Sequence, residues 1–120
     1  MANEDTFHLG IKALIRNQKG QILVLKANIK DLKQGTSVVE HWDLPGGRVQ
    51  KGENSDQTLA REVKEEIGVE DIHIIKLLDA SVSKMRLFCT NAGLILFTYL
   101  CSMDNNIEIK LNDNEEVYSS

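Results

Sequence analysis

Residues 46–69 read GGRVQKGENSDQTLAREVKEEIGV, and this stretch decides how the rest of the chain is interpreted. It opens with a pair of glycines that directly follow a proline. Pro45 fixes one backbone torsion, and Gly46 and Gly47 permit backbone conformations that other residues avoid. The sequence therefore predicts a sharp turn whose backbone comes close to a ligand.

A helix is predicted after this turn and a short loop. Asn54 or Ser55 supplies a side-chain oxygen for the N-cap, and Gly68 supplies a left-handed stop. We therefore expect a helix from Asp56 to Ile67. Its apolar residues recur at helical spacing and form one broad face, made of Leu59, Ala60, Val63 and Ile67.

Three glutamates gather on a neighbouring face of this helix, within an arc of about 100°. They are Glu62, Glu65 and Glu66. Like charges three and four residues apart repel by a few tenths of a kcal/mol per pair, so the cluster destabilises the helix unless a cation binds. Oxygen donors without cysteine or histidine suit Mg²⁺ or Mn²⁺. A solvated, charged helix face is the alternative interpretation.

The spacing of these residues resembles the complete signature of the Nudix hydrolases. Gly47 is followed after five residues by Glu53, and seven more residues lead to the segment Arg61–Val69, REVKEEIGV. The preceding residues 42–46, WDLPG, resemble the usual lead-in. The resemblance implies an α/β fold, an α/β/α sandwich with a mixed β-sheet, in a single domain over residues 1–120.

The resemblance also implies residue roles. Glu62, Glu65 and Glu66 would bind the metal, with the carbonyl oxygen of Gly47 as a fourth ligand. Glu53 and Arg61 would orient the metal-binding helix and the loop through an ion pair, so the catalytic set is Glu53, Arg61, Glu65 and Glu66. The general base is either a glutamate of the signature or a later acidic residue, with four candidates: Asp104, Glu108, Glu115 and Glu116.

Two residues outside the signature are candidates for substrate binding. Lys26 ends an apolar strand where related enzymes often place a basic group against substrate phosphate, although a lysine that protects a sheet edge is equally consistent. Trp42 has the ring needed to stack on a nucleobase, and packing in the core is its alternative role.

The remaining segments predict a β-rich framework. Strands from Phe7 to Ile15 and from Gln21 to Ala27 are expected to form a hairpin around Asn17–Gly20. Further strands are expected at Ser37–Asp43, Ile72–Ala80, Ala92–Ser102 and Ile107–Leu111. Asn28–Thr36 is predicted to be an exposed loop that borders the substrate, and Ser81–Asn91 is a connection without a clear pattern.

Size and charge restrict the classes of partner. A chain of 120 residues with 42% hydrophobic composition can bury one core. A net charge of -4 and a pI near 5.3 argue against a general nucleic-acid-binding surface and favour small anionic substrates that are held by metal and a few basic groups.

The sequence also predicts a cytoplasmic location without a membrane segment. Cys89 and Cys101 lack the spacing of a metal site, and residues 1–5 do not resemble a secretory leader. The longest apolar run, near Leu94–Cys101, is too short for a membrane-spanning helix. Related domains continue past a segment like Asn112–Tyr118 into a second helix, which this sequence does not contain. Either the sequence is truncated or the fold is closed differently. If the covering helix is absent, we expect exposed apolar sheet surface, with either self-association as a homodimer or low stability.

The family hydrolyses a nucleoside diphosphate linked to another moiety, and the resemblance implies a magnesium-dependent pyrophosphohydrolase. Residues 83–87, SKMRL, lack the proline or tyrosine of some subfamilies, which disfavours ADP-ribose and dinucleoside polyphosphates. We expect a nucleoside triphosphate as substrate and a monophosphate and pyrophosphate as products. A nucleoside diphosphate sugar hydrolase and a non-catalytic nucleotide-binding module are the alternatives.

Overall fold

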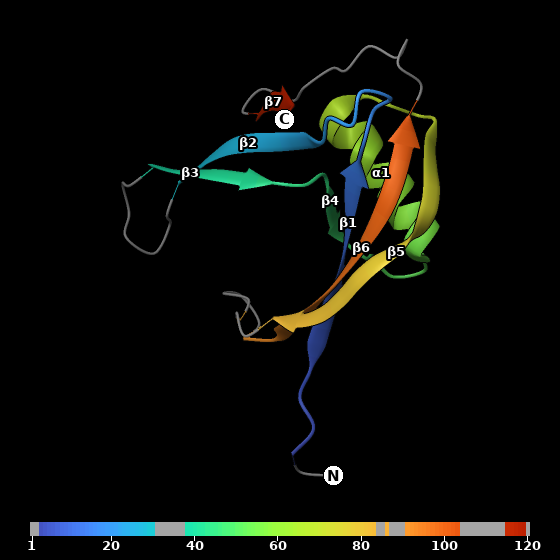
Figure 1. The fold of residues 1–120 in the computed structure, drawn as a ribbon. Helices are drawn as coiled ribbons and strands as arrows, with labels where there is room; N and C mark the ends of the chain where they lie inside the picture. Colours follow the sequence, from blue (N-terminus) through green and yellow to red (C-terminus); the bar gives the residue numbers. More distant parts are fainter. Residues whose placement is uncertain (1–2, 31–37, 84–85, 87–90, 104–114, 120) are drawn as a thin grey trace.

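The structure is a computed structural model that describes residues 3–30, 38–83, 86, 91–103 and 115–119, with the backbone alone for 26–30, 38–42 and 115–119. This part of the chain forms two sheets and one helix (Figure 1). In chain order the elements are β1 (Phe7–Ile15), β2 (Leu23–Lys30), β3 (Val38–Asp43), β4 (Gly46–Arg48), α1 (Ser55–Ile67), β5 (Ile72–Ser83), β6 (Gly93–Met103) and β7 (Glu115–Ser119).

The first sheet is mixed, as predicted. Its strand order is β4-β1-β6-β5, with β1 and β6 parallel and the other neighbours antiparallel. Helix α1 packs on one face of this sheet, because alternate residues of β1 and one face of α1 are apolar and bury each other. The core comprises Ile11, Ala13, Ile15, Leu23, Leu25, Leu59, Val63, Ile67, Val69 and Cys101. The described residues contain a single helix, α1. They therefore contain one helical layer of the expected sandwich.

Local signals set both ends of α1. Of the two candidate caps, Asn54 is the N-cap. Its side chain accepts a hydrogen bond from the Gln57 N–H at 2.9 Å, and the Gln57 side chain accepts one from the Asn54 N–H at 2.9 Å. Gly68 adopts the left-handed conformation, with φ 73°, and its N–H donates to the Lys64 carbonyl oxygen. The helix therefore begins one residue before the predicted start and ends where predicted.

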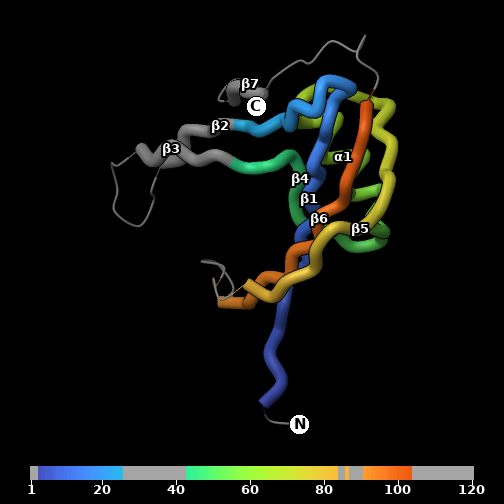
Figure 2. The backbone as a smooth tube through the Cα atoms, viewed as in Figure 1, coloured from blue at the N-terminus to red at the C-terminus, as the bar shows by residue number. Residues whose placement is uncertain are grey.

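The hairpin predicted between β1 and β2 is wrong beyond its turn. The turn itself forms, because the Asn17 side-chain oxygen accepts hydrogen bonds from the N–H groups of Lys19 and Gln21. After the turn (Figure 2) there is one bridge, Arg16 to Ile22, and β2 then enters the second sheet (Figure 1). Strand β1 pairs with β4 and β6 along the sheet instead, so both of its edges are occupied.

The second sheet is antiparallel, with the order β3-β2-β7. Strand β2 extends to Lys30, into the segment that we expected to be a loop. The register places the backbone of Lys26 between those of Trp42 and Glu116. Three of the expected segments lie wholly or partly outside the described residues: the rest of that loop, the strand at Ile107–Leu111 and most of the connection before Asn91.

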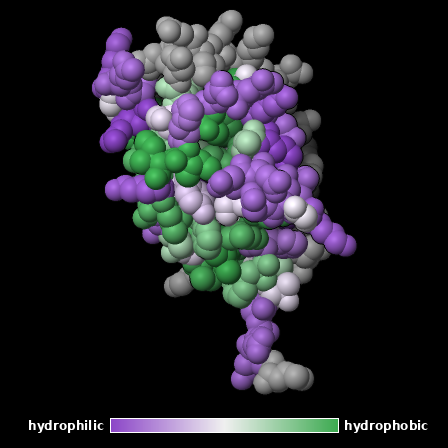
Figure 3. Space-filling view, turned by 90° about the vertical axis from the view of Figure 1, so that its right-hand side faces the viewer, coloured by the Kyte–Doolittle hydropathy of each residue, from purple (hydrophilic) through white to green (hydrophobic). Residues whose placement is uncertain are grey.

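Strand β5 forms the free edge of the first sheet opposite β4. It runs three residues further than predicted and contains two shifts in its register with β6. Four of its large apolar side chains are 44–64% exposed: Ile75, Leu77, Leu78 and Val82. Figure 3 views this side of the molecule and shows apolar side chains gathered on it. An exposed apolar sheet surface, which the sequence predicted, is therefore present on β5.

Candidate active site

In the turn from Asp43 to Arg48, one set of backbone groups faces helix α1. Strand β4 pairs antiparallel with β1, with Gly47 opposite Ile11. Two residues to either side, the Val49 N–H donates to Leu9 and the Pro45 carbonyl accepts from Ala13, both at 2.8 Å. Hydrogen-bonded pairs recur at every second residue of an antiparallel ladder, so the Gly47 N–H and carbonyl face β1.

The neighbouring residues Gly46 and Arg48 therefore point their backbone groups away from β1. Two contacts support this orientation. The Gly46 N–H donates to Glu66 Oε1 at 2.8 Å, and the Arg48 carbonyl oxygen accepts from Arg61 Nη2 at 3.1 Å. The site is thus a strand edge whose alternate backbone groups contact one face of α1.

The three glutamates of α1 lie beside this edge with different exposure. The Glu62 side chain is 18% exposed, the Glu65 side chain is 57% exposed, and Glu66 is half-buried against the turn. A Cβ added at Gly47 would overlap the Glu62 carboxylate, which is the end of a flexible side chain. Glycine at this position therefore leaves room for the Glu62 carboxylate where it lies.

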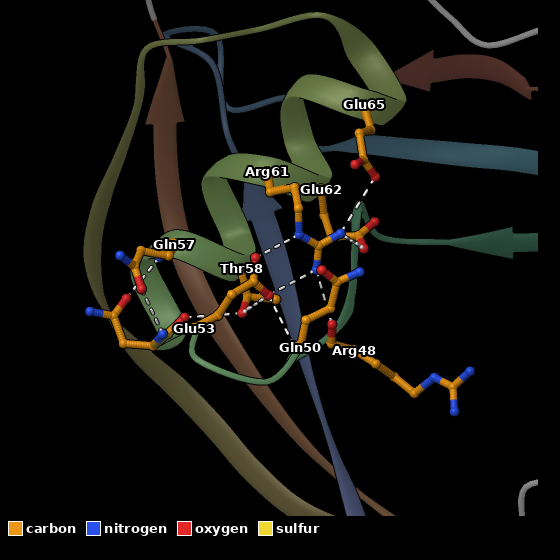
Figure 4. Close-up of polar contacts among 9 residues, drawn as sticks. Arg48, Gln50, Glu53, Gln57, Thr58, Arg61, Glu62 and Glu65 are labelled. Carbon is orange, nitrogen blue, oxygen red and sulfur yellow. Dashed lines mark hydrogen bonds and ion pairs between the residues drawn. The ribbon is translucent and has the colours of Figure 1, made fainter.

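Arg61 connects these groups (Figure 4). Its Nε donates to Glu53 Oε2 at 2.7 Å and its Nη1 donates to Glu62 Oε1 at 2.7 Å. Nη1 also lies 3.5 Å from Glu65 Oε2. The predicted ion pair between Glu53 and Arg61 is therefore present, and the same guanidinium holds the first glutamate of the helix.

Glu53 is fixed from several directions. It accepts hydrogen bonds from Arg61, from the Gln50 N–H at 2.9 Å and from the hydroxyl of Thr58 at 3.1 Å. These donors favour the charged form, and Arg61 foremost lowers the pKa of Glu53 to about 2. The same pairing raises the pKa of Arg61. Glu53 is therefore an ionised anchor rather than a proton donor near neutral pH.

The arrangement of the carboxylates bears on metal binding. In the described part of the chain, no three side chains of the metal-binding types are gathered closely enough to hold an ion. The carboxylates are held apart because Glu62 accepts a hydrogen bond from Arg61, whereas Glu66 accepts one from the Gly46 N–H. The donor set nevertheless fits Mg²⁺ or Mn²⁺, because it consists of oxygens on one helix face beside the turn.

The structure places the predicted substrate residues apart from the helix. Lys26 and Trp42 are directly opposite each other in the second sheet, and the strand that carries Trp42 leads into the turn at Asp43. Among the four later candidates for the general base, Asp104 and Glu108 lie outside the described residues, and the backbone alone is described for Glu115 and Glu116.

Sequence reasoning missed a cavity at the other end of β4. Its volume is about 350 Å³, and its lining consists of His8, Arg48, Val49, Gln50 and Glu62. A cation directly after the double glycine was a signal for Arg48. His8 had no such signal, because it comes into place through the pairing of β1 with β4.

A second missed feature is the ion pair between Lys12 and Asp43. Lys12 Nζ lies 2.7 Å from Asp43 Oδ2. The other oxygen of Asp43 accepts from the Leu44 N–H at 2.7 Å. The pair thus fastens the start of the turn to β1.

Comparison with known proteins agrees with this architecture. A family model described as the NUDIX domain matches residues 6–119. The chain therefore belongs to the Nudix family, which confirms the resemblance seen in the sequence.

Two curated relatives each align with about half of this chain. An uncharacterised Nudix hydrolase of Listeria monocytogenes is 46% identical over 63 residues, which are 52% of this chain and 35% of the relative. An 8-oxo-dGTP diphosphatase of Haemophilus influenzae is 38% identical over 56 residues, which are 47% of this chain and 38% of the relative. The aligned segments thus span little more than a third of these curated relatives.

A solved structure extends the likeness to nearly the whole fold. The MutT protein of Methanosarcina mazei superposes with a TM-score of 0.71 at 25% identity, over 98% of this chain and 77% of that one. Among the described residues, no helix is both long and apolar enough to span a membrane.

Proposed function

We propose that this chain is a divalent-metal-dependent pyrophosphohydrolase that cleaves a nucleoside triphosphate into a nucleoside monophosphate and pyrophosphate. The observation that carries the proposal is the placement of three helix glutamates beside the Gly46 turn, with Glu66 hydrogen-bonded to the Gly46 N–H at 2.8 Å. The name of the Haemophilus relative supports a triphosphate as substrate.

The residues proposed to hold Mg²⁺ or Mn²⁺ are Glu62, Glu65 and Glu66, together with a backbone carbonyl of the turn. The strand register favours the carbonyl of Gly46 over that of Gly47, because Gly47 faces β1. When bound, the metal neutralises phosphate charge and lowers the pKa of a water molecule.

The signature residues then have distinct roles. Glu53 and Arg61 position the loop and Glu62 through their ion pair, in which each side chain is only about one-fifth exposed. Glu65 and Glu66 lie closest to the reacting phosphate in this scheme. Of the two, Glu66 is the stronger candidate to accept a proton from the attacking water, because its backbone contact places it at the turn.

The second sheet would bind the nucleoside side of the substrate. Lys26 would contact a phosphate and Trp42 would stack on the base, since the register sets their backbones opposite each other next to the turn. We further propose that the chain is one domain that acts in the cytoplasm on small nucleotides as a homodimer. The acidic net charge of -4 supports small substrates over nucleic acid.

The test is an assay of product release in Mg²⁺ across nucleoside triphosphates, a nucleoside diphosphate sugar and a dinucleoside polyphosphate. We expect pyrophosphate from a triphosphate, and a loss of rate of at least about a hundredfold in Glu66→Gln. Glu70→Gln is the matched control, because Glu70 lies beyond the helix and pairs with Lys64. Cleavage of the sugar compound alone would favour the diphosphate sugar hydrolase. Nucleotide binding without turnover would favour the non-catalytic module.

A further inference from the structure

The cavity at the end of β4 has a polar lining suited to phosphate. Four of its five residues are polar, namely His8, Arg48, Gln50 and Glu62, and the fifth is Val49. Its lining has no phenylalanine, tyrosine or tryptophan, and its volume of about 350 Å³ lies at the low end for ligand pockets. A small anion with several oxygens matches this lining.

Among the described residues, Arg48 has no carboxylate partner, in contrast to the two cations of α1. Arg61 pairs with Glu53, and Lys64 pairs with Glu70. Within the described part of the chain, the Arg48 guanidinium makes no hydrogen bond or ion pair, and its side chain points away from α1 (Figure 4). The Arg48 backbone is meanwhile held by Arg61 through its carbonyl. A fixed backbone with an unpaired guanidinium is suited to bind phosphate oxygens bidentately.

His8 and Gln50 add donors on the same side. Gly10 lies opposite Arg48 in the register, which sets His8 opposite Gln50, so all three polar side chains belong to the sheet face away from α1. Glu62 is the one carboxylate in the lining, and its charge is offset by Arg61 at 2.7 Å. The cavity therefore presents unpaired donors without an unpaired carboxylate.

The order of groups along β4 indicates which phosphates would reach this cavity. The strand that carries Trp42 enters the turn at Asp43, the Gly46 N–H contacts Glu66, and the cavity begins at Arg48. A substrate whose nucleoside lies toward the second sheet, with the bond to be cleaved beside Glu66, would extend its distal phosphates past Glu62.

We infer that His8, Arg48 and Gln50 form a binding site for the terminal diphosphate of the substrate, which leaves as pyrophosphate. This inference rests on the proposed function for its direction along β4, whereas the anion site itself rests on the cavity. Arg48 is the principal ligand, because a guanidinium offers five donors in a fixed fork and an imidazole at most two.

The test measures equilibrium binding of inorganic pyrophosphate by calorimetry at fixed Mg²⁺, for the wild type, Arg48→Gln, His8→Ala and Lys51→Gln. Lys51 is the matched control, because it is an exposed cation three residues from Arg48 that does not line the cavity. We expect Arg48→Gln to weaken binding about tenfold or more and His8→Ala about threefold. Lys51→Gln should change binding less than twofold.

Two further measurements separate a local effect from a general one. Thermal unfolding checks that each variant is folded, and Mn²⁺ binding followed by electron paramagnetic resonance should be the same in Arg48→Gln as in the wild type. Equal weakening in Arg48→Gln and Lys51→Gln, or wild-type affinity in Arg48→Gln, would overturn the inference. Binding that depends on Arg48 in a protein that hydrolyses no nucleotide would leave the anion site standing and refute the proposed function instead.

Discussion

The segment from Pro45 to Val69 buries its large apolar side chains in the core, whereas strand β5, which follows it in the chain, exposes several of its own. In the first, Leu59, Val63 and Ile67 are 0% exposed, and Arg61 contacts three carboxylates. In the second, Leu78 is 44% exposed and Val82 is 64% exposed, on a strand with one neighbour in its sheet. The polar side-chain contacts described for the first segment join residues within about twenty positions of each other, whereas the second segment exposes apolar surface.

This difference shows which of the two regions contributes more to the free energy of unfolding. Burial removes apolar area from water at about 25 cal/mol per Å², so the α1 face contributes far more than the exposed half of β5. Exposed apolar edges favour association with another chain. The register shifts in β5 and the charged residues Lys76 and Asp79 limit such pairing.

The largest effect is expected at the turn. Gly46 has φ 149°, and an added Cβ would overlap the carbonyl oxygen of Ile11, which is backbone and cannot move aside. Gly46→Ala should therefore lower the free energy of unfolding by about 3 kcal/mol or more in chemical denaturation. Gly47→Ala meets only the Glu62 side chain and should lose activity with a smaller loss of stability. Equal stability of the two variants would contradict this account of the turn.

A paired substitution compares the two regions directly. Leu59→Ala removes a side chain that is 0% exposed and should cost about 2–5 kcal/mol. Leu77→Ala removes one that is 48% exposed and should cost about 1 kcal/mol or less. Urea denaturation measures both. A cost for Leu77→Ala as large as that for Leu59→Ala would mean that β5 is covered in solution, which dilution or light scattering would then trace to self-association.

A smaller effect is expected from pH. The folded pKa of Glu53 is about 2, below its ordinary value of 4.5, so the unfolded chain takes up the proton first as the pH falls. The stability contributed by Glu53 is therefore complete above about 4.5 and is lost as the pH falls toward about 2. Glu53→Gln should flatten the dependence of the melting temperature on pH in this window. An unchanged slope would show that Arg61 does not hold this carboxylate.

The sequence predicted what depends on near neighbours. The ends of α1 follow from Asn54 and Gly68, whose signals act within four residues, and β1 has the predicted bounds. The hairpin was mispredicted because turn chemistry at Asn17 is local, whereas the partners of β1 are β4 and the distant β6.

The candidate site divides in the same way. The glutamate cluster was predictable because one helix carries it, and the pair of Glu53 and Arg61 was predictable from the family pattern. The choice of the Gly46 carbonyl over the Gly47 carbonyl as the proposed backbone ligand required the strand register. The cavity residue His8 required the pairing of strands about forty residues apart in sequence, which no local pattern encodes.

The central claim is that the glutamates of α1 hold a divalent cation beside the Gly46 turn. Its most direct test is a titration of Mn²⁺ followed by electron paramagnetic resonance, for the wild type, Glu66→Gln and the control Glu70→Gln. We predict that Glu66→Gln weakens Mn²⁺ binding at least about tenfold while Glu70→Gln binds as the wild type does. Wild-type affinity in Glu66→Gln, or an equal loss in Glu70→Gln, would contradict the claim.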